Sequence, residues 1–262
     1  MKSFNRLVYP YIAWSVVMIV IPVFLIALFS IINSDGGVIT LRFTFDNFGR
    51  FFSDAIFVEV LIRSLRIAFF TTIICIVVGY PAAYAISKLS PNSQHTAVLL
   101  ITLPMLINML VRTYAWRGIL IATNFSPEIK VYIGMVYNFI PFMILQIYTS
   151  LSKMDPNLEI AAHDLGCDDL KTFTKVILPL SIPGIISGIT LVFLPAVSSF
   201  FIPKLLGGGS FVVIGNLIES FFLTAGNWNF GSAISIIMTI VILISMYITK
   251  KFDYSKGASD EK

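Results

Sequence analysis

Charged residues are scarce in this sequence: Asp, Glu, Lys and Arg make up 12% of its 262 residues, whereas 57% are apolar. Soluble domains carry roughly 25% charged residues, so the shortage excludes a soluble domain and favours a polytopic membrane protein. The 18 basic residues exceed the 14 acidic residues only slightly. They form no basic patch interleaved with aromatic side chains, which argues against a nucleic-acid partner.

Cysteine and histidine are also rare, with two of each. Cys75 lies in an apolar stretch and Cys167 in a polar loop, so we expect neither a disulfide nor a metal site. His95 and His163 lie at the edges of apolar stretches, without the paired acids or activated nucleophile that a membrane enzyme needs. We therefore expect no catalytic residue, no metal and no cofactor bound by this chain.

Long apolar runs, in contrast, are plentiful. Six are long enough to cross about 30 Å of hydrocarbon: approximately 11–32, 60–86, 95–121, 129–150, 180–201 and 231–249. The first run is too long for a signal peptide, and no small-residue cleavage pattern precedes Asn33. The sequence predicts an all-α polytopic membrane protein with one transmembrane domain over 11–250, preceded by segment 1–10 and followed by a tail over 251–262.

Five prolines lie inside the predicted spans, at positions 81, 104, 141, 183 and 195. A proline within a membrane helix frees a carbonyl and bends the helix. Bent helices suit a moving pathway, but proline is common in membrane helices, so ordinary packing kinks remain an equal alternative.

The distribution of basic residues predicts the orientation. With the N-terminus inside, ten basic residues fall on the cytoplasmic side: Lys2, Arg6, Lys88, Lys153, Lys171, Lys175, Lys250, Lys251, Lys256 and Lys262. Four fall on the opposite side: Arg42, Arg50, Lys130 and Lys204. Because cytoplasmic loops are enriched in Lys and Arg, both termini are expected in the cytoplasm.

The polar segment with the most helix start and stop signals runs from Asp155 to Pro179. Asp155 is a favourable N-cap, and Pro156 suits the first helical position, where a missing N–H costs nothing. Gly166 can adopt the left-handed conformation that ends a helix. Four apolar residues between these signals share one helical face: Leu158, Ala161, Ala162 and Leu165.

A second short helix is expected after the glycine. Asp168 or Asp169 can cap it, and Pro179 closes it. The cytoplasmic loop 151–179 is then a hairpin of two short helices, in which Ala161 and Ala162 allow another protein surface to approach closely. A solvated connector is the simpler alternative. A docking element for a soluble partner agrees better with the number of helix start and stop signals in the loop.

The hairpin resembles the EAA loop of ABC-importer permeases, whose pattern is Glu-Ala-Ala, three residues, Gly, nine residues, and then Ile-x-Leu-Pro. The matching residues are Ala161-Ala162, Gly166 and Leu178-Pro179, with Val176 at the Ile position. The acid departs from the pattern, because Ile160 precedes Ala161 and Glu159 lies one position earlier. One position is roughly 100° around a helix, which predicts a different contact for Glu159.

This resemblance implies the type I ABC-importer permease fold, with six transmembrane helices and a cytoplasmic coupling helix. It also implies which residues couple the loop to an ATPase: Glu159, Ala161, Ala162, Asp164, Leu165, Gly166 and Pro179.

The two longest external segments are 33–59 and 202–230. In the first, we expect a turn at Asp35-Gly36-Gly37, an extended stretch from Leu41 to Phe45, and a short amphipathic helix bearing Phe48, Phe51 and Phe52. In the second, Gly207-Gly208-Gly209-Ser210 lacks the Gly-Lys-Ser/Thr of a P-loop and is interpreted as a flexible bend. The range 214–223 is expected to be a short apolar helix.

Charged and aromatic side chains meet at the expected outer end of the third span, in Arg112-Thr113-Tyr114-Ala115-Trp116-Arg117. An intramembrane arginine faces protein or water, and Glu59 or Glu219 is a possible partner for Arg112. Tyr114 and Trp116 suit either an interfacial aromatic belt, which is the commoner use, or the substrate pathway. The pathway candidates are Tyr114, Trp116, Glu219 and Trp228.

Several longer strings resemble the spermidine/putrescine branch of these permeases, specifically the first of its two permease subunits: 111–116, 135–144, 202–208, 214–218 and 227–233. Asn229 departs from that group, which usually has Pro there. The resemblance implies a bacterial cell-membrane importer with a second permease subunit, two copies of a cytoplasmic ABC ATPase that uses ATP and Mg²⁺, and an external polyamine-binding protein. This chain would itself hydrolyse nothing.

A cationic substrate gains some support from the abundant aromatic residues, which bind ammonium groups through cation–π contacts. Membrane acids are few, with Glu59 and Glu219 near the outer face. Either the pathway is lined by aromatic rings and carbonyls on this side, or the second permease supplies carboxylates. The alternatives are an importer permease for another small solute, such as an amino acid, phosphonate or ferric ion, and a passive channel, which would leave the docking loop unused.

Overall fold

Apolar helices dominate the computed structural model, which describes residues 2–33, 42–209 and 211–257. Within these ranges, five helices are long and apolar enough to cross a membrane. A bent pair, α4 (Pro91–Leu106) and α5 (Met109–Ile121), makes a sixth if it counts as one span. The five are contributed by α1 (Lys2–Ser30), α3 (Ala55–Ser87), α6 (Pro127–Leu151), α9 (Leu178–Ser198) and α12 (Trp228–Gly257). The predicted all-α polytopic architecture is confirmed.

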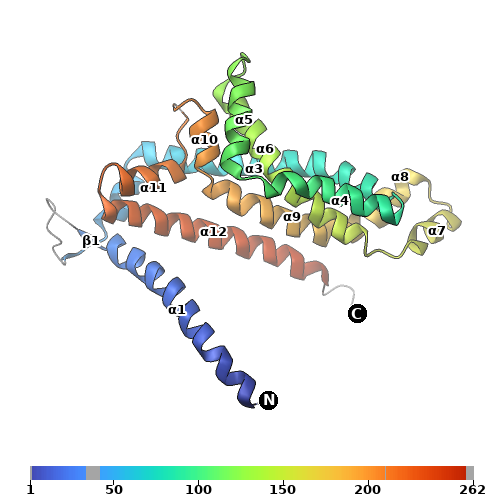
Figure 1. Cartoon of the computed structure of the whole chain (residues 1–262), viewed down its shortest axis with the longest axis horizontal. Helices are drawn as coiled ribbons and strands as arrows, with labels where there is room; N and C mark the ends of the chain where they lie inside the picture. The colour runs from blue at the N-terminus through green and yellow to red at the C-terminus, as the bar shows by residue number, and fades with distance from the viewer. Residues whose placement is uncertain (1, 34–41, 210, 258–262) are drawn as a thin grey trace. The chain divides into compact units, whose positions relative to one another are not determined.

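Shorter elements connect these helices (Figure 1). They are β1 (Ile32–Asn33), β2 (Arg42–Phe43), α2 (Asp46–Ser53), α4 (Pro91–Leu106), α5 (Met109–Ile121), α7 (Asn157–Asp164), α8 (Asp169–Thr172), the π-helix η1 (Phe173–Ile177), α10 (Phe201–Leu206) and α11 (Ile214–Leu223). The strands β1 and β2 pair antiparallel, with Ile32 opposite Phe43.

The chain divides into two units, of which the first comprises 1–61 and 214–241. Its core is aromatic: the Phe51 ring stacks on Phe57 with centroids 6.0 Å apart, and Phe221 meets Phe230 edge-on at 4.8 Å. The Asn229 side-chain amide donates to the carbonyl of Ile32 at 2.6 Å. Proline has no side-chain amide with which to make this bond, which gives the departure at position 229 a structural role.

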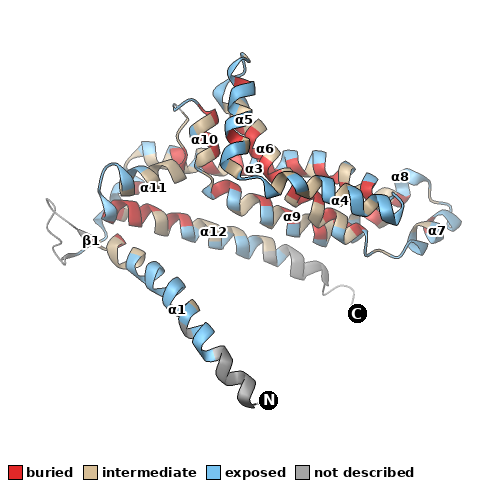
Figure 2. Cartoon of the chain, in the orientation of Figure 1, coloured by how far each residue is buried: buried red, intermediate tan, exposed pale blue. Residues whose placement is uncertain are grey.

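Most of the described side chains of α1 are exposed (Figure 2). They include large apolar groups such as Tyr11, Trp14 and Phe24, which are 73%, 65% and 62% exposed. Such a helix is stable where lipid or another protein surrounds it, because the backbone hydrogen bonds are satisfied within the helix.

The second unit comprises 62–213 and 242–262, and its core lies where α6 packs against α9. Two buried glycines of α9 allow the close approach. A Cβ atom at Gly184 would lie 2.4 Å from the Cβ of Ser150, and one at Gly188 would lie 2.5 Å from Met143 Sδ. The four-residue spacing is the small-residue pattern that lets membrane helices pack closely.

The third predicted span is not one continuous helix. The helices α4 and α5 meet at an angle of 89° around residues 107–108. The Asn108 side chain accepts a hydrogen bond from the Leu110 N–H at 2.8 Å, which caps α5 and starts a new helix there. The break lies three residues after Pro104, which the sequence marks as an interruption.

The second helix of the hairpin does not end at Pro179, contrary to the prediction. It continues from α8 through η1 into α9, as one apolar helical stretch over Asp169–Ser198. The Leu178 N–H donates to the Phe173 carbonyl, five residues back. A π-turn of this kind accommodates a proline immediately downstream, because it rearranges the hydrogen bonds that the missing N–H disrupts.

The two segments that the sequence predicts to be external, 33–59 and 202–230, agree in part with their predictions. The short helix that carries Phe48, Phe51 and Phe52 is α2, but Phe51 is fully buried while Phe52 is 65% exposed. The helix α11 has the predicted bounds. The predicted turn over 35–37 lies outside the described residues, as does Ser210.

Candidate functional site

The candidate site is the hairpin formed by α7 and α8, which lies at one end of the second unit (Figure 1). Its first helix begins at Asn157, one residue later than the sequence predicts, and Pro156 directly precedes it. The Asp155 carboxylate accepts a hydrogen bond from the Asn157 N–H at 2.9 Å. This bond satisfies one of the free N–H groups at the start of α7.

A glycine turn ends α7. Gly166 has a φ of 83°, and its N–H donates to the His163 carbonyl at 2.9 Å. The Cys167 N–H donates to the Ala162 carbonyl at 3.0 Å. These two bonds form a Schellman motif, which satisfies the last carbonyls of the helix and fixes the direction in which the chain leaves it.

Asp168, rather than Asp169, caps α8. Its carboxylate accepts a hydrogen bond from the Lys171 N–H at 2.7 Å, and its other oxygen lies 3.2 Å from the Lys171 ammonium. These bonds lower the pKa of Asp168 below its ordinary value, with a smaller contribution from the charge of Lys175. The cap is therefore fully ionised at neutral pH.

The predicted apolar face of the first helix does not act as one face. Ala162 is buried within the chain, whereas Leu165 is 86% exposed. Leu165 follows the last residue of α7, so the helical repeat no longer sets the direction of its side chain. Ala161, Asp164, Gly166 and Pro179 are exposed as well.

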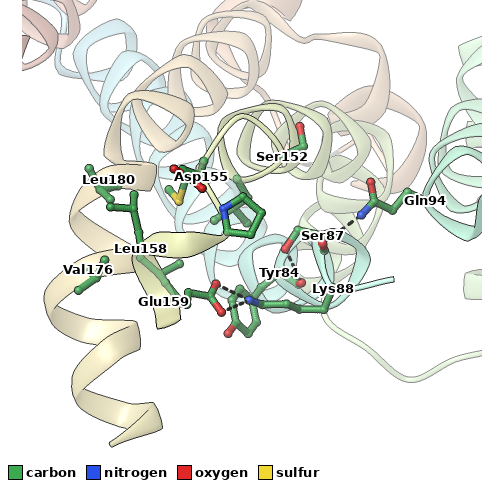
Figure 3. A pocket seen from close by; sticks show the side chains of 14 residues that line it. Tyr84, Ser87, Lys88, Gln94, Ser152, Asp155, Leu158, Glu159, Val176 and Leu180 are labelled. Carbon is green, nitrogen blue, oxygen red and sulfur yellow. Dashed lines mark hydrogen bonds and ion pairs between the residues drawn. The ribbon is translucent and has the colours of Figure 1, made fainter. Parts of the chain in front are cut away.

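Glu159 pairs within the chain. Both of its carboxylate oxygens contact the ammonium of Lys88, as Figure 3 shows. That ammonium also lies 5.2 Å from the ring centroid of Tyr84. Because Lys88 directly follows α3, the pair connects the end of this long helix to α7. The sequence places Lys88 in a turn but contains no signal that pairs it with a residue 71 positions away.

A cavity of about 310 Å³ lies at the base of the hairpin, and the Lys88–Glu159 pair contributes to its wall (Figure 3). The rest of the wall comes from the ends of α3, α4 and α6, from the start of the hairpin at 155–158, and from Val176, Ile177 and Leu180. Gln94 ties these ends together: its amide donates to the carbonyls of Ser87 at 3.1 Å and Leu89 at 2.9 Å, and its oxygen accepts from the Tyr148 hydroxyl at 3.0 Å. The hairpin is thus attached to helix ends that the hydrogen bonds of Gln94 hold together.

The four pathway candidates fall in both units. In the second unit, Tyr114 is 54% exposed and meets Phe201, whereas Trp116 meets Tyr137 with centroids 5.2 Å apart. These two candidates therefore contact different aromatic rings. In the first unit, Glu219 is half-buried on α11. Trp228 is 54% exposed and meets Phe222 at 5.9 Å.

Arg112 lies in the second unit, whereas Glu59 and Glu219, its expected partners, lie in the first, so this pairing stays a prediction. Its Nε and Nη1 atoms are buried and have no hydrogen-bond partner among the described residues. The guanidinium lies 6.0 Å from the ring centroid of Tyr137, the same ring that Trp116 contacts. Within the second unit, Arg112 therefore makes a cation–π contact with Tyr137.

Comparison with known proteins places this geometry in context. Residues 76–253 match the family described as binding-protein-dependent transport system inner membrane component. The spermidine/putrescine transport system permease protein PotB of Haemophilus influenzae is 36% identical, over 90% of this chain and 89% of the relative. PotB of Escherichia coli is 35% identical, over 90% of this chain and 93% of the relative.

The fold also resembles a solved structure. A chain in the crystal structure of a bacterial ABC transporter involved in the import of the acidic polysaccharide alginate matches with a TM-score of 0.77 and 14% identity. The match covers 97% of this chain and 96% of the other. At this identity, the likeness concerns the fold alone.

Proposed function

Because the chain belongs to the family of binding-protein-dependent transport system inner membrane components, we propose that it is a permease subunit of an ATP-driven ABC importer for polyamines. Spermidine and putrescine are the proposed substrates. One observation carries this assignment: the 36% identity to a spermidine/putrescine permease extends over 90% of this chain and 89% of the relative.

The hairpin is the proposed contact with the ATPase. Ile160, Leu165 and Leu170 are 58%, 86% and 73% exposed, and a soluble partner would cover this apolar surface. Two capped helix starts, a Schellman turn and the Lys88–Glu159 pair support a rigid hairpin. A rigid hairpin can pass the motion of the ATPase dimer to the spans, which then switch between two arrangements.

The proposed setting is a bacterial cell membrane, with the hairpin and both termini in the cytoplasm. The excess of ten basic residues against four on the two sides supports this orientation. A second permease completes the pathway, and an external polyamine-binding protein delivers the substrate. Two copies of a cytoplasmic ATPase use ATP and Mg²⁺, whereas this chain is non-catalytic and binds no cofactor.

For the pathway itself we propose Tyr114, Trp116, Glu219 and Trp228 as contacts. Aromatic rings hold ammonium groups through cation–π interactions, which strengthen when water is excluded. Acids are few among the spans, so either aromatic rings and carbonyls line this side of the pathway or the second permease supplies carboxylates.

Uptake by the reconstituted complex tests the assignment. The complex is placed in proteoliposomes with its binding protein, and uptake of labelled spermidine and putrescine is measured with and without ATP. We expect ATP-dependent uptake of at least one polyamine. ATP-dependent uptake of an amino acid, a phosphonate or ferric ion, without uptake of either polyamine, would support the alternative importer instead.

A further inference from the structure

Side chains at the end of α3 hold the hairpin at more than one point within the second unit. Lys88, directly after the helix, pairs with Glu159 of α7 (Figure 3). Tyr80 and Tyr84 lie four residues apart on α3, so they share one face of the helix. Both contact η1, the segment through which the hairpin continues into α9. The hairpin is therefore joined to α9 through the backbone and to α3 through side chains.

The first residue of the π-turn lies against both tyrosines. The Phe173 ring meets the Tyr80 ring edge-on, with centroids 5.7 Å apart, and it meets the Tyr84 ring at 5.6 Å. The Phe173 carbonyl accepts the hydrogen bond from the Leu178 N–H that closes the π-turn. Edge-on ring pairs are favourable and have a preferred geometry. These contacts therefore fix where the start of η1 lies against α3.

The other end of the π-turn is attached to Tyr80 by two hydrogen bonds in series. The Ser181 hydroxyl donates to the Leu178 carbonyl at 2.9 Å, and it has only one proton to donate. The Tyr80 hydroxyl, 2.8 Å from Ser181 Oγ, is therefore the donor of the second bond. Tyr80 and Ser181 are 7% and 0% exposed, so protein surrounds both groups. Leu178 thus closes the π-turn with its N–H and is attached to α3 through its carbonyl.

The π-turn sets the angle between the hairpin and α9. It is closed by a bond between residues five apart instead of four, so it contains one residue more than an α-helical turn. One residue corresponds to roughly 100° of rotation about a helix axis. If this turn moved along the helix or became α-helical, the hairpin would rotate relative to α9. The contacts of Tyr80 at both ends of η1 hold this angle.

We propose that Tyr80 is a positioning residue for coupling, which makes the hairpin, α3 and α9 move together. Its ring holds Phe173 at the start of η1. Its hydroxyl holds Leu178, just after η1, through Ser181. Motion that an ATPase gives to the hairpin then reaches α3 as well as α9. The inference rests on the proposed function, because the hairpin must contact an ATPase for its position to matter.

The variant Tyr80→Phe tests this role, because it removes the hydroxyl and keeps the ring. The whole complex is reconstituted in proteoliposomes with its binding protein, and polyamine uptake and ATP hydrolysis are measured on the same preparation. We expect the uptake per ATP hydrolysed to fall about fivefold, the effect of one lost hydrogen bond. ATP hydrolysis itself should continue, since the variant does not alter the proposed contact with the ATPase.

A matched control is Tyr84→Phe. Tyr84 meets the same Phe173 ring, but its hydroxyl makes no hydrogen bond to the residues that the structure describes. This variant should keep the wild-type ratio of uptake to ATP hydrolysis. Ser181→Ala removes the acceptor of the Tyr80 bond and should lower the ratio. The double variant Tyr80→Phe/Ser181→Ala should be no worse than Ser181→Ala alone, because both changes break the same bond.

The melting temperature of each variant separates coupling from stability. A lower melting temperature for Tyr80→Phe with an unchanged ratio would make the bond a packing contact and overturn the inference. An equal loss in Tyr84→Phe, or additive losses in the double variant, would overturn it as well.

Wild-type uptake, measured in parallel, tests the proposed function separately. If the wild-type complex imports another solute and no polyamine, only the polyamine assignment fails, and the ratio for that solute tests Tyr80. If the wild-type complex imports polyamine and Tyr80→Phe keeps the wild-type ratio, only the inference about Tyr80 fails.

Discussion

The ammonium of Lys88 contacts both carboxylate oxygens of Glu159 and thereby joins the end of α3 to the start of the hairpin. The two side chains are 42% and 34% exposed, and pairs at this exposure contribute about 0.2–1 kcal/mol to stability. Their importance therefore lies in geometry, since they set where α7 sits relative to a membrane-spanning helix.

The first prediction concerns the sign of this pair. Lys88→Glu places two carboxylates against each other, so polyamine uptake should fall several-fold while the complex still assembles. The double variant Lys88→Glu/Glu159→Lys restores an ion pair and should recover most of the uptake. Wild-type uptake by Lys88→Glu, measured in proteoliposomes at equal protein content, would contradict a role for the pair.

The second prediction concerns the turn at Gly166. Proline fixes φ near −65° and lacks the N–H that donates to His163, so Gly166→Pro cannot keep the observed φ of 83°. We expect the protein to reach the membrane but the complex to lose substrate-stimulated ATP hydrolysis. Gly166→Asn is the matched control, because asparagine tolerates the left-handed conformation. Normal stimulation in Gly166→Pro would count against the hairpin as a coupling element.

The third prediction separates the two alanines. Sequence alone suggests that Ala162→Trp blocks assembly by filling a gap between proteins, but Ala162 is 6% exposed and packs inside this chain. Ala162→Trp should instead destabilise the hairpin, at about 1–3 kcal/mol for overpacking, and raise its sensitivity to protease. Ala161→Trp, on the exposed side, should leave protease sensitivity unchanged and reduce co-purification of the ATPase. The reverse pattern would disprove this assignment of faces.

The fourth prediction concerns the packing of α6 against α9. Gly184→Leu forces a side chain against Ser150 and the Gln146 carbonyl, atoms that a Cβ alone would approach to 2.4 and 2.9 Å. The melting temperature of the purified protein should drop, by an amount equivalent to at least about 1–3 kcal/mol. Ser187→Leu lies on the exposed side of the same helix and serves as the control. Equal melting temperatures for the two variants would refute the close approach.

The fifth prediction concerns Asn229 in the first unit. Its amide donates to the carbonyls of Ile32 at 2.6 Å and Phe29 at 3.2 Å. Asn229→Pro removes both bonds and should lower stability by about 1–3 kcal/mol, because a carbonyl loses its partner. Thermal unfolding in detergent measures the change, with Asn229→Gln retaining the amide. Unchanged stability in Asn229→Pro would mean that these bonds are dispensable.

The sequence by itself determined the features that depend on neighbouring residues. Apolar run length marks the spans, because crossing hydrocarbon requires about 20 residues of helix. The cap at Asp155 and the turn at Gly166 were predictable for the same reason: their hydrogen bonds join atoms within a few positions of one another.

The tertiary structure alone decided which distant residues meet. Lys88 and Glu159 are 71 positions apart, and Asn229 lies 197 positions from Ile32. Likewise, packing buries Ala162, and the helix continues past Pro179 through the π-turn of η1. Periodicity describes one helix at a time, whereas these outcomes depend on the surface that each helix finds beside it.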